Sequence, residues 1–278
     1  MPKPGLSLQR VLPGARQGIA AAVLCWRVVL VDLDLAIADD HVLVLASSWH
    51  IEHPTHHVQG LAVDDRSLWI TSVQRESEQG WVYRVDRTTL KVVAERRLVA
   101  GMQIHPGGIQ LTGQSLWVPL AEYRPNSSST VLRLDADTLQ TDASFTVDDH
   151  LGAIASDGNE RLYAANWDSR QIYTFNHDGR QLGVRDNETG IKFQDLEWHA
   201  GLLYGVGRVK HDGQDVGVVV AFEPTTGKVT DQWRLTGTTR KGESDFGREG
   251  FSMWRRDFFV MPEDGPNTTI YQFLAPQP

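Results

Sequence analysis

The sequence predicts an all-β fold built from a repeated unit of about 45 residues. Three observations carry this prediction. The 278 residues include 25 Gly and 9 Trp, a mixture of turn formers and large aromatic side chains. Short runs of alternating apolar and polar residues are separated by turn-forming residues. One outline also recurs five times at a spacing typical of a four-stranded propeller blade, so we expect a β-propeller.

The first two strands of each repeat are the clearest. Each repeat opens on polar or glycine residues, continues as a short apolar strand, and adds a second strand such as residues 67–70 or 115–118. The separations between equivalent first-strand positions are 48, 45, 42 and 55 residues. Those positions are Gln59, Gly107, Gly152, Gln194 and Glu249.

Two further strands complete the repeat. Third strands are expected over residues 81–86, 131–135, 171–175 and 218–222, and fourth strands over 92–98, 140–147, 181–185 and 229–235. Asp, Thr and Gly between them suit tight turns. At Asp135, Asp137 and Asp142 we therefore expect a turn rather than a calcium loop.

Closure of the ring is predicted from the two ends of the repeat region. The fifth repeat has only three strands, the last over residues 269–274, and residues 41–46 form a strand without a partner. We expect this N-terminal strand to complete the fifth blade and so remove the open sheet edges. Six blades remain the alternative, if residues 18–48 carry most of another blade.

Composition and charge exclude several classes of protein. The formal net charge is −8 without a basic face, so nucleic acid is not an expected partner. No apolar run reaches the roughly 18 residues of a membrane span. The single cysteine excludes an intramolecular disulfide and a Cys-rich zinc site. We expect a monomer that binds a small-molecule ligand.

The domain organisation follows from the repeat. Residues 41–278 form one expected propeller domain, preceded by an extension over residues 1–40. Residues 18–26 have the shape of a weak signal segment after Arg10 and Arg16, although no good cleavage region follows. Both a cytoplasmic and a secreted location are therefore open.

Polar residues far apart in the sequence are expected on one face. In a propeller the first strands line the central channel, and the start of each lies on the same face as the end of the second strand. Residues from both sets should surround the axis there and bind substrate. These residues are Gln59, Glu122, Tyr123, Arg124, Trp167, Asp168, Gln194, Asp195 and Arg248.

Three histidines occupy equivalent positions in this set. His57, His105 and His150 could bind a divalent metal such as zinc, manganese or calcium through neutral imidazole. Glu249 or Glu263 would then act as a base on metal-bound water. The alternative is that the histidines only bond buried waters and backbone groups.

Two further patterns have competing interpretations. Arg170 or Arg124 could orient a substrate by binding its carboxylate or phosphate; alternatively, both form ion pairs with acids of neighbouring blades. His50, His53, His56 and His57 crowd together with Glu52, but Pro54 excludes a helical zinc motif. A linker entering the first blade is the expected structure there.

The runs at residues 56–60, 105–108, 121–125, 149–153, 166–170 and 262–265 resemble an uncharacterised microbial and fungal propeller family over about residues 41–274. More distantly, the chain is similar to the calcium-dependent phosphotriesterase and gluconolactonase superfamily. That resemblance implies a metal ligand at Glu249, before Gly250, but the expected Asn and Asp ligands of other blades are missing. NHL-type lyases, which bind zinc through three blade histidines, are similar only at His57, His105 and His150.

Taken together, the sequence predicts a polar site on the channel face. The function that this site favours is that of a metal-dependent hydrolase or lyase acting on a small carboxylate, ester or lactone. The alternatives are a non-catalytic propeller that binds a glycan, peptide or metabolite, and a scaffold for protein partners. No serine-hydrolase elbow, phosphate-binding loop or dinucleotide fingerprint is present.

Overall fold

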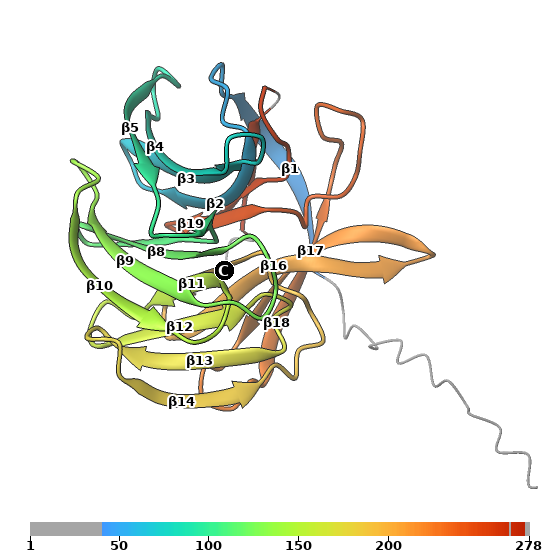
Figure 1. Ribbon diagram of the computed structural model, residues 1–278. Helices are drawn as coiled ribbons and strands as arrows, with labels where there is room; N and C mark the ends of the chain where they lie inside the picture. Colours follow the sequence, from blue (N-terminus) through green and yellow to red (C-terminus); the bar gives the residue numbers. More distant parts are fainter. Residues whose placement is uncertain (1–40, 267, 276–278) are drawn as a thin grey trace, which may run out of the picture. The chain divides into compact units, whose positions relative to one another are not determined.

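The computed structural model describes residues 41–266 and 268–275, in which every named element is a β-strand. The strands form four-stranded antiparallel units, called blades below, which follow one another around a central axis in chain order (Figure 1). The predicted all-β propeller is confirmed. No helix within these residues is long and apolar enough to cross a membrane. Residues 1–40, with the predicted signal segment, lie outside the described residues.

By their pairing, the described strands group into five blades, two of which share one eight-stranded sheet. Blade 1 contains β2 (His57–Val63), β3 (Ser67–Gln74), β4 (Gln79–Asp86) and β5 (Val92–Leu98). In blade 2 the first strand is divided into β6 (Gln103–Pro106) and β7 (Gln110–Thr112), which both pair with β8 (Ser115–Glu122); β9 (Ser129–Asp135) and β10 (Thr141–Val147) follow. Blade 3 contains β11 (Leu151–Ser156), β12 (Arg161–Asn166), β13 (Gln171–Asn176) and β14 (Gln181–Asp186). Blade 4 contains β15 (Asp195–His199), β16 (Leu202–His211), β17 (Gln214–Phe222) and β18 (Val229–Thr236). Blade 5 contains β19 (Gly250–Trp254), β20 (Asp257–Met261), β21 (Thr269–Phe273) and β1 (His41–His50).

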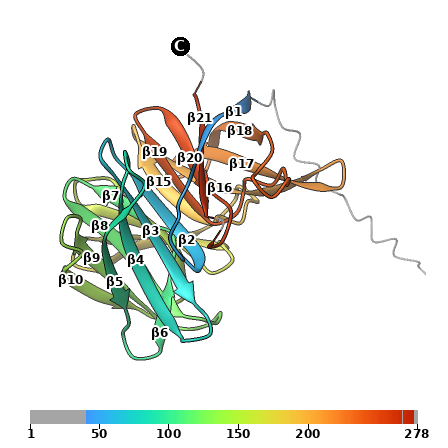
Figure 2. The same cartoon turned by 90° about the horizontal axis from the view of Figure 1, so that it is seen from above.

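β1 completes blade 5 as predicted, but with a different part of the strand from the predicted residues 41–46. Residues 45–50 pair antiparallel with β21 and supply the fourth strand of blade 5. Residues 41–44 pair in parallel with β18, the outer strand of blade 4. Blades 4 and 5 therefore share one continuous eight-stranded sheet, and β1 lies between β18 and β21 in Figure 2. This second pairing was not expected from the sequence.

The core consists of apolar clusters between neighbouring blades. Among the described residues one such cluster joins each successive pair of blades, including blade 5 to blade 1. In the last of these, Ile51, Leu61 and Tyr83 pack with Phe259 and Ile270. Every blade thus buries apolar side chains against both neighbours, which stabilises a closed ring rather than an open stack.

The turn chemistry repeats as expected. Asp86 Oδ1 accepts hydrogen bonds from the backbone N–H groups of Thr88 and Thr89, and Asp135 Oδ1 accepts from that of Thr138. The hydroxyls of Thr138 and Thr89 donate to the same oxygens, and together these side-chain and backbone hydrogen bonds lower the pKa of both aspartates. Asp137 pairs instead with Arg84, so these aspartates serve turns and ion pairs, not a shared calcium loop.

Candidate functional site

One end of the channel, called the channel mouth below, collects polar side chains from four blades. Contacts between blades bring together the starts of the first strands and the ends of the second strands. The residues concerned are His57, Gln59, Arg75, His105, Tyr123, His150, Trp167, Glu249 and Asp264. Seven of the fifteen residues predicted for the site are in this group, namely His57, Gln59, His105, Tyr123, His150, Trp167 and Glu249.

An oriented histidine connects blades 1 and 5. His57 Nδ1 lies 2.9 Å from Asp264 Oδ1, and the backbone N–H of Val58 donates to the same oxygen over 3.2 Å. Burial acts to raise the pKa of Asp264, but the hydrogen bond and charge of His57 and the N–H of Val58 bring it below its usual value. An aspartate held in this way orients the imidazole and leaves its Nε2 atom available for proton transfer.

Glu249 lies beside this pair. Gln59 Nε2 donates to Glu249 Oε2 over 3.3 Å, from blade 1 to blade 5. Burial raises the pKa of Glu249 to about 7, with Asp264 acting in the same direction and His57 opposing it. Its backbone φ of 54° lies in the left-handed region, where a residue with a Cβ is strained. A carboxyl titrating near neutrality at a strained position is typical of a functional site.

His105 and His150 form a buried pair instead of a metal site. His150 Nδ1 lies 2.8 Å from the carbonyl oxygen of Arg124, which can only accept, so Nδ1 carries the proton. His150 Nε2 then accepts from His105 Nδ1 over 3.4 Å. Burial lowers the pKa of both rings.

The predicted metal site with His57 is therefore not supported. Both nitrogens of His150 are engaged, and Asp264 holds Nδ1 of His57. Across residues 41–266 and 268–275 no group of three or more metal-ligating side chains comes together. The alternative of structural histidines bonded to backbone groups describes His150.

An aromatic surface adjoins the histidine pair. His105 contacts the ring of Tyr123 edge-on at 4.7 Å between centroids, and His150 contacts that of Trp167 at 4.5 Å. Tyr123 and Trp167 stay 40% and 42% exposed, which is high for large aromatic side chains. The guanidinium of Arg75 lies over the Tyr123 ring. Arg75 follows β3 as Tyr123 follows β8 and Trp167 follows β12, so the repeat register could have identified it.

The predicted substrate-gripping arginines pair locally. Arg124 bonds Glu122 over 2.8 Å, and Arg170 bonds Asp168 over 3.0 Å, each two residues along its own loop. Pairing with neighbouring blades is therefore wrong for both. Arg170 is largely exposed and has no contact with Glu249 among the described contacts, so a catalytic role for it is unsupported. Arg248 binds Asp245, which also faces Arg208.

Asp195 is structural, contrary to its prediction as a substrate ligand. It is fully buried, and Oδ2 accepts from the backbone N–H groups of Leu61 in blade 1 and Phe251 in blade 5. Oδ1 accepts from Leu196 N–H over 2.9 Å. Burial raises the pKa of this carboxyl, and these donors oppose the rise by favouring the ionised form. For Gln194 the structure shows only a backbone hydrogen bond, to Val206.

Glu263 is likewise structural. It is 2% exposed; Oε2 accepts from the Tyr271 hydroxyl over 2.6 Å and Oε1 from the backbone N–H of Lys241 over 3.1 Å. Both oxygens thus support blade 5. Its neighbour Asp264 reaches the channel mouth instead. Sequence alone did not separate the two because they are adjacent beyond the end of β20.

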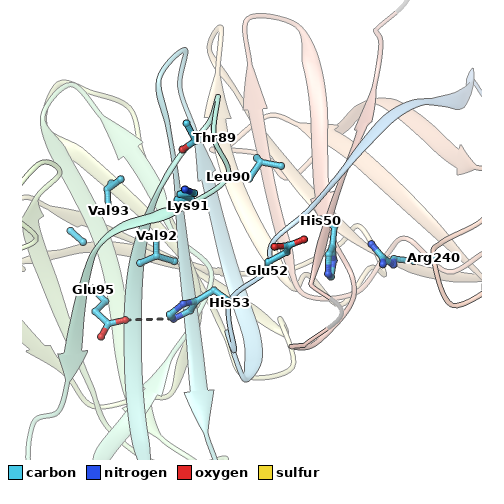
Figure 3. A pocket seen from close by; sticks show the side chains of 11 residues that line it. His50, Glu52, His53, Thr89, Leu90, Lys91, Val92, Val93, Glu95 and Arg240 are labelled. Atoms are coloured by element: carbon cyan, nitrogen blue, oxygen red, sulfur yellow. Dashed lines mark ion pairs between the residues drawn. The ribbon is translucent and has the colours of Figure 1, made fainter.

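The histidine-rich linker lines a separate cavity of about 1030 Å³ between β1, β5 and the loop near Arg240 (Figure 3). His53 lies 3.5 Å from Glu95 of β5, and Glu52 lies near His50 in this view. His57 alone of the four crowded histidines reaches the channel mouth through Asp264. The predicted linker into blade 1 is present, and it does not form a zinc motif.

Comparisons with known proteins agree with the fold. A model of a family of unknown function (DUF6454) matches residues 63–192, less than half of the chain. The search of curated proteins found no match. Among solved structures, a glutaminyl cyclase of Myxococcus xanthus is 14% identical with a TM-score of 0.63 and covers 84% of this chain and 97% of its own.

A second solved structure, the tail fibre of Staphylococcus aureus phage P68, is 12% identical with a TM-score of 0.51. It covers 82% of this chain and 52% of its own. Identities this low show the fold alone. The chain is therefore similar to propeller-like proteins in architecture, and the resemblances to particular enzyme families stay predictions.

Proposed function

We propose that the channel mouth binds a small polar molecule and transfers protons to and from it, with Glu249 as the general acid–base. The observation that carries this proposal is the half-buried Glu249 carboxyl, whose pKa is raised to about 7, beside the His57–Asp264 pair. A group titrating near the working pH both accepts and donates protons readily. His57 provides a second proton-transfer group, oriented by Asp264.

The surrounding surface favours a small carboxylate, ester or lactone. Tyr123 and Trp167 supply an exposed apolar platform, and the cation of Arg75 lies above Tyr123. Such a platform holds the apolar part of a ligand while a guanidinium binds its carboxylate or carbonyl oxygen. The buried His105–His150 pair contacts the rings of Tyr123 and Trp167 and so supports this platform.

One further reaction belongs in the test. The similar fold of a glutaminyl cyclase raises cyclisation of an N-terminal glutamine as a candidate. That reaction needs one group to take a proton from the attacking amine and return it to the departing ammonia. A carboxyl with a pKa of about 7 suits both steps.

The test is a substrate panel with matched variants. Nitrophenyl esters, lactones and a glutaminyl peptide are assayed with the wild type, Glu249→Gln, His57→Gln and the control Glu160→Gln, an exposed carboxylate in a turn of blade 3. We expect Glu249→Gln to lower kcat about a hundredfold or more, and Glu160→Gln to leave it unchanged. Equal activity of Glu249→Gln and Glu160→Gln would refute the assignment of Glu249.

A non-catalytic ligand site is the second candidate, favoured by the exposure of Tyr123 and Trp167. Glycan and peptide arrays would then show binding that is lost in Trp167→Ala and kept in Glu249→Gln. Turnover of any panel substrate that depends on Glu249 would decide against this alternative.

A further inference from the structure

A second cavity lies at the opposite end of the channel from the mouth. Its volume is about 400 Å³, and it is formed where the first strands end, after β2, β7, β15 and β19. It is called the lower cavity below. The lining residues that matter for its chemistry are Glu197, Trp198, His199, Ser252, Trp254 and Arg255.

Glu197 is the charged group that the lower cavity encloses most deeply. It is 6% exposed, and Ser252 Oγ donates to its Oε2 over 3.1 Å. The hydroxyl of Ser252 is fixed in this orientation because its oxygen accepts the backbone N–H of Val63 over 3.1 Å. A carboxylate has about four lone-pair positions, so acceptor capacity remains on Glu197 for a ligand.

No cation of the protein compensates Glu197. Within the described part of the chain no Lys or Arg forms an ion pair with it, and the nearby Asp195 adds a second negative charge. Desolvation by burial raises the pKa of Glu197, and the charge of Asp195 acts in the same direction. An ionised carboxylate that is buried without a counter-charge is unfavourable, and a bound cation would supply what the fold lacks.

The walls favour an organic cation over a divalent metal. Trp198 and Trp254 contribute aromatic surface, which attracts ammonium groups through cation–π interactions. Trp198 is held in place by stacking on Tyr163 at 5.3 Å between ring centroids. The second acidic side chain of the wall, Asp64, already accepts two backbone N–H groups at Oδ1. The described residues also contain no group of three metal-ligating side chains.

We propose that the lower cavity binds a small alkylammonium ion, with the ammonium group on Glu197 and the alkyl chain between Trp198 and Trp254. Arg255, which is exposed and also lines the cavity, would bind a carboxylate of the same ligand. This inference does not rest on the proposed function, because the channel mouth lies at the other end of the inner strands.

The test uses n-propylammonium chloride as the probe and 1-propanol as its neutral counterpart. Isothermal titration is carried out with the wild type, Glu197→Gln and the control Glu160→Gln. We expect propylammonium to bind the wild type and Glu160→Gln equally, and to bind Glu197→Gln at least about tenfold more weakly. Equal affinity for Glu197→Gln, or equal binding of 1-propanol, would overturn the proposal.

A measurement on the wild type alone covers the case in which Glu197→Gln does not fold. The indole N–H signals of Trp198 and Trp254 in a nitrogen–proton correlation spectrum should shift with propylammonium and stay in place with 1-propanol. Absence of any shift up to the highest soluble concentration would overturn the proposal. Calcium chloride is the third probe. Binding of calcium without binding of propylammonium would also overturn the proposal.

Discussion

Replacing Asp195 with Asn is expected to weaken the whole ring. The carboxylate of Asp195 lies on the channel axis, and Oδ2 alone accepts backbone N–H groups from two other blades, Leu61 at 3.1 Å and Phe251 at 3.0 Å. Asn has one acceptor oxygen and one donor NH₂ group. If the NH₂ group takes the place of Oδ2, the buried N–H groups of Leu61 and Phe251 lose their acceptor. If it takes the place of Oδ1, the N–H of Leu196 loses its acceptor instead.

The expected loss of stability follows from the number of N–H donors left without an acceptor. A buried N–H without an acceptor costs about 1–3 kcal/mol, so the loss at Leu61 and Phe251 is about 2–6 kcal/mol. Total stabilities of roughly 5–15 kcal/mol make this a large fraction. In the other orientation of the amide only the N–H of Leu196 loses its acceptor, so the destabilisation lies toward the lower end of this range.

The assay is urea unfolding at pH 7, followed by tryptophan fluorescence. Asp212→Asn serves as the control, because Asp212 is exposed at the tip of the β16–β17 hairpin and Asn tolerates its positive φ. We expect the midpoint of Asp195→Asn to fall clearly and that of Asp212→Asn to stay unchanged. Equal stability of Asp195→Asn and the wild type would refute the assignment of the Asp195 carboxyl as the acceptor for these donors.

Three further predictions concern the same axis. The pKa of Glu249 rises from 4.5 to about 7 on folding, so the free energy of unfolding of the wild type should fall by up to about 3 kcal/mol relative to that of Glu249→Gln between pH 4.5 and pH 8. Urea unfolding of both proteins at the two pH values measures this, and an equal change in both would contradict it. Burial lowers the pKa of His105, so acidification below pH 6.5 protonates this ring more readily in the unfolded state and lowers the stability of the fold. The melting temperature of His105→Gln should therefore decline less than that of the wild type from pH 7 to pH 5. A Cβ at Gly108 would lie 2.2 Å from Asp195 Oδ1, whereas one at Gly183 meets nothing within 4 Å; Gly108→Ala should therefore unfold at much lower urea than Gly183→Ala, and similar midpoints would show that the axis can relax.

Much of the fold could be predicted because its signals are local. The alternation within strands, the Asp and Thr turns and the repeat length all lie within about 45 residues of sequence. The repeat register also brought His57, Gln59, His105 and Glu249 to one face. Register could be inferred because equivalent positions in successive blades occupy equivalent places around the axis.

The chemistry of individual residues was less predictable. Glu263 and Asp264 are adjacent, yet one supports Tyr271 and the other orients His57. Arg124 pairs with an acid two residues away, within its own loop. These outcomes depend on how a loop turns beyond its strand and on which partner is nearest in space, and neither is encoded in the repeat.

By itself the sequence determined a closed array of four-stranded blades and the face on which polar residues would gather, because strand alternation and turn geometry act over short distances along the chain. Only the tertiary structure decided the role of each polar group. It placed Asp195 deep on the axis as an acceptor for other blades, left Glu249 near the mouth with a pKa of about 7, and enclosed Glu197 at the far end. The physical reason is the position of each carboxyl along the channel. The inner strands of different blades together determine how far each carboxyl is shielded from water and how many backbone N–H donors lie within its reach.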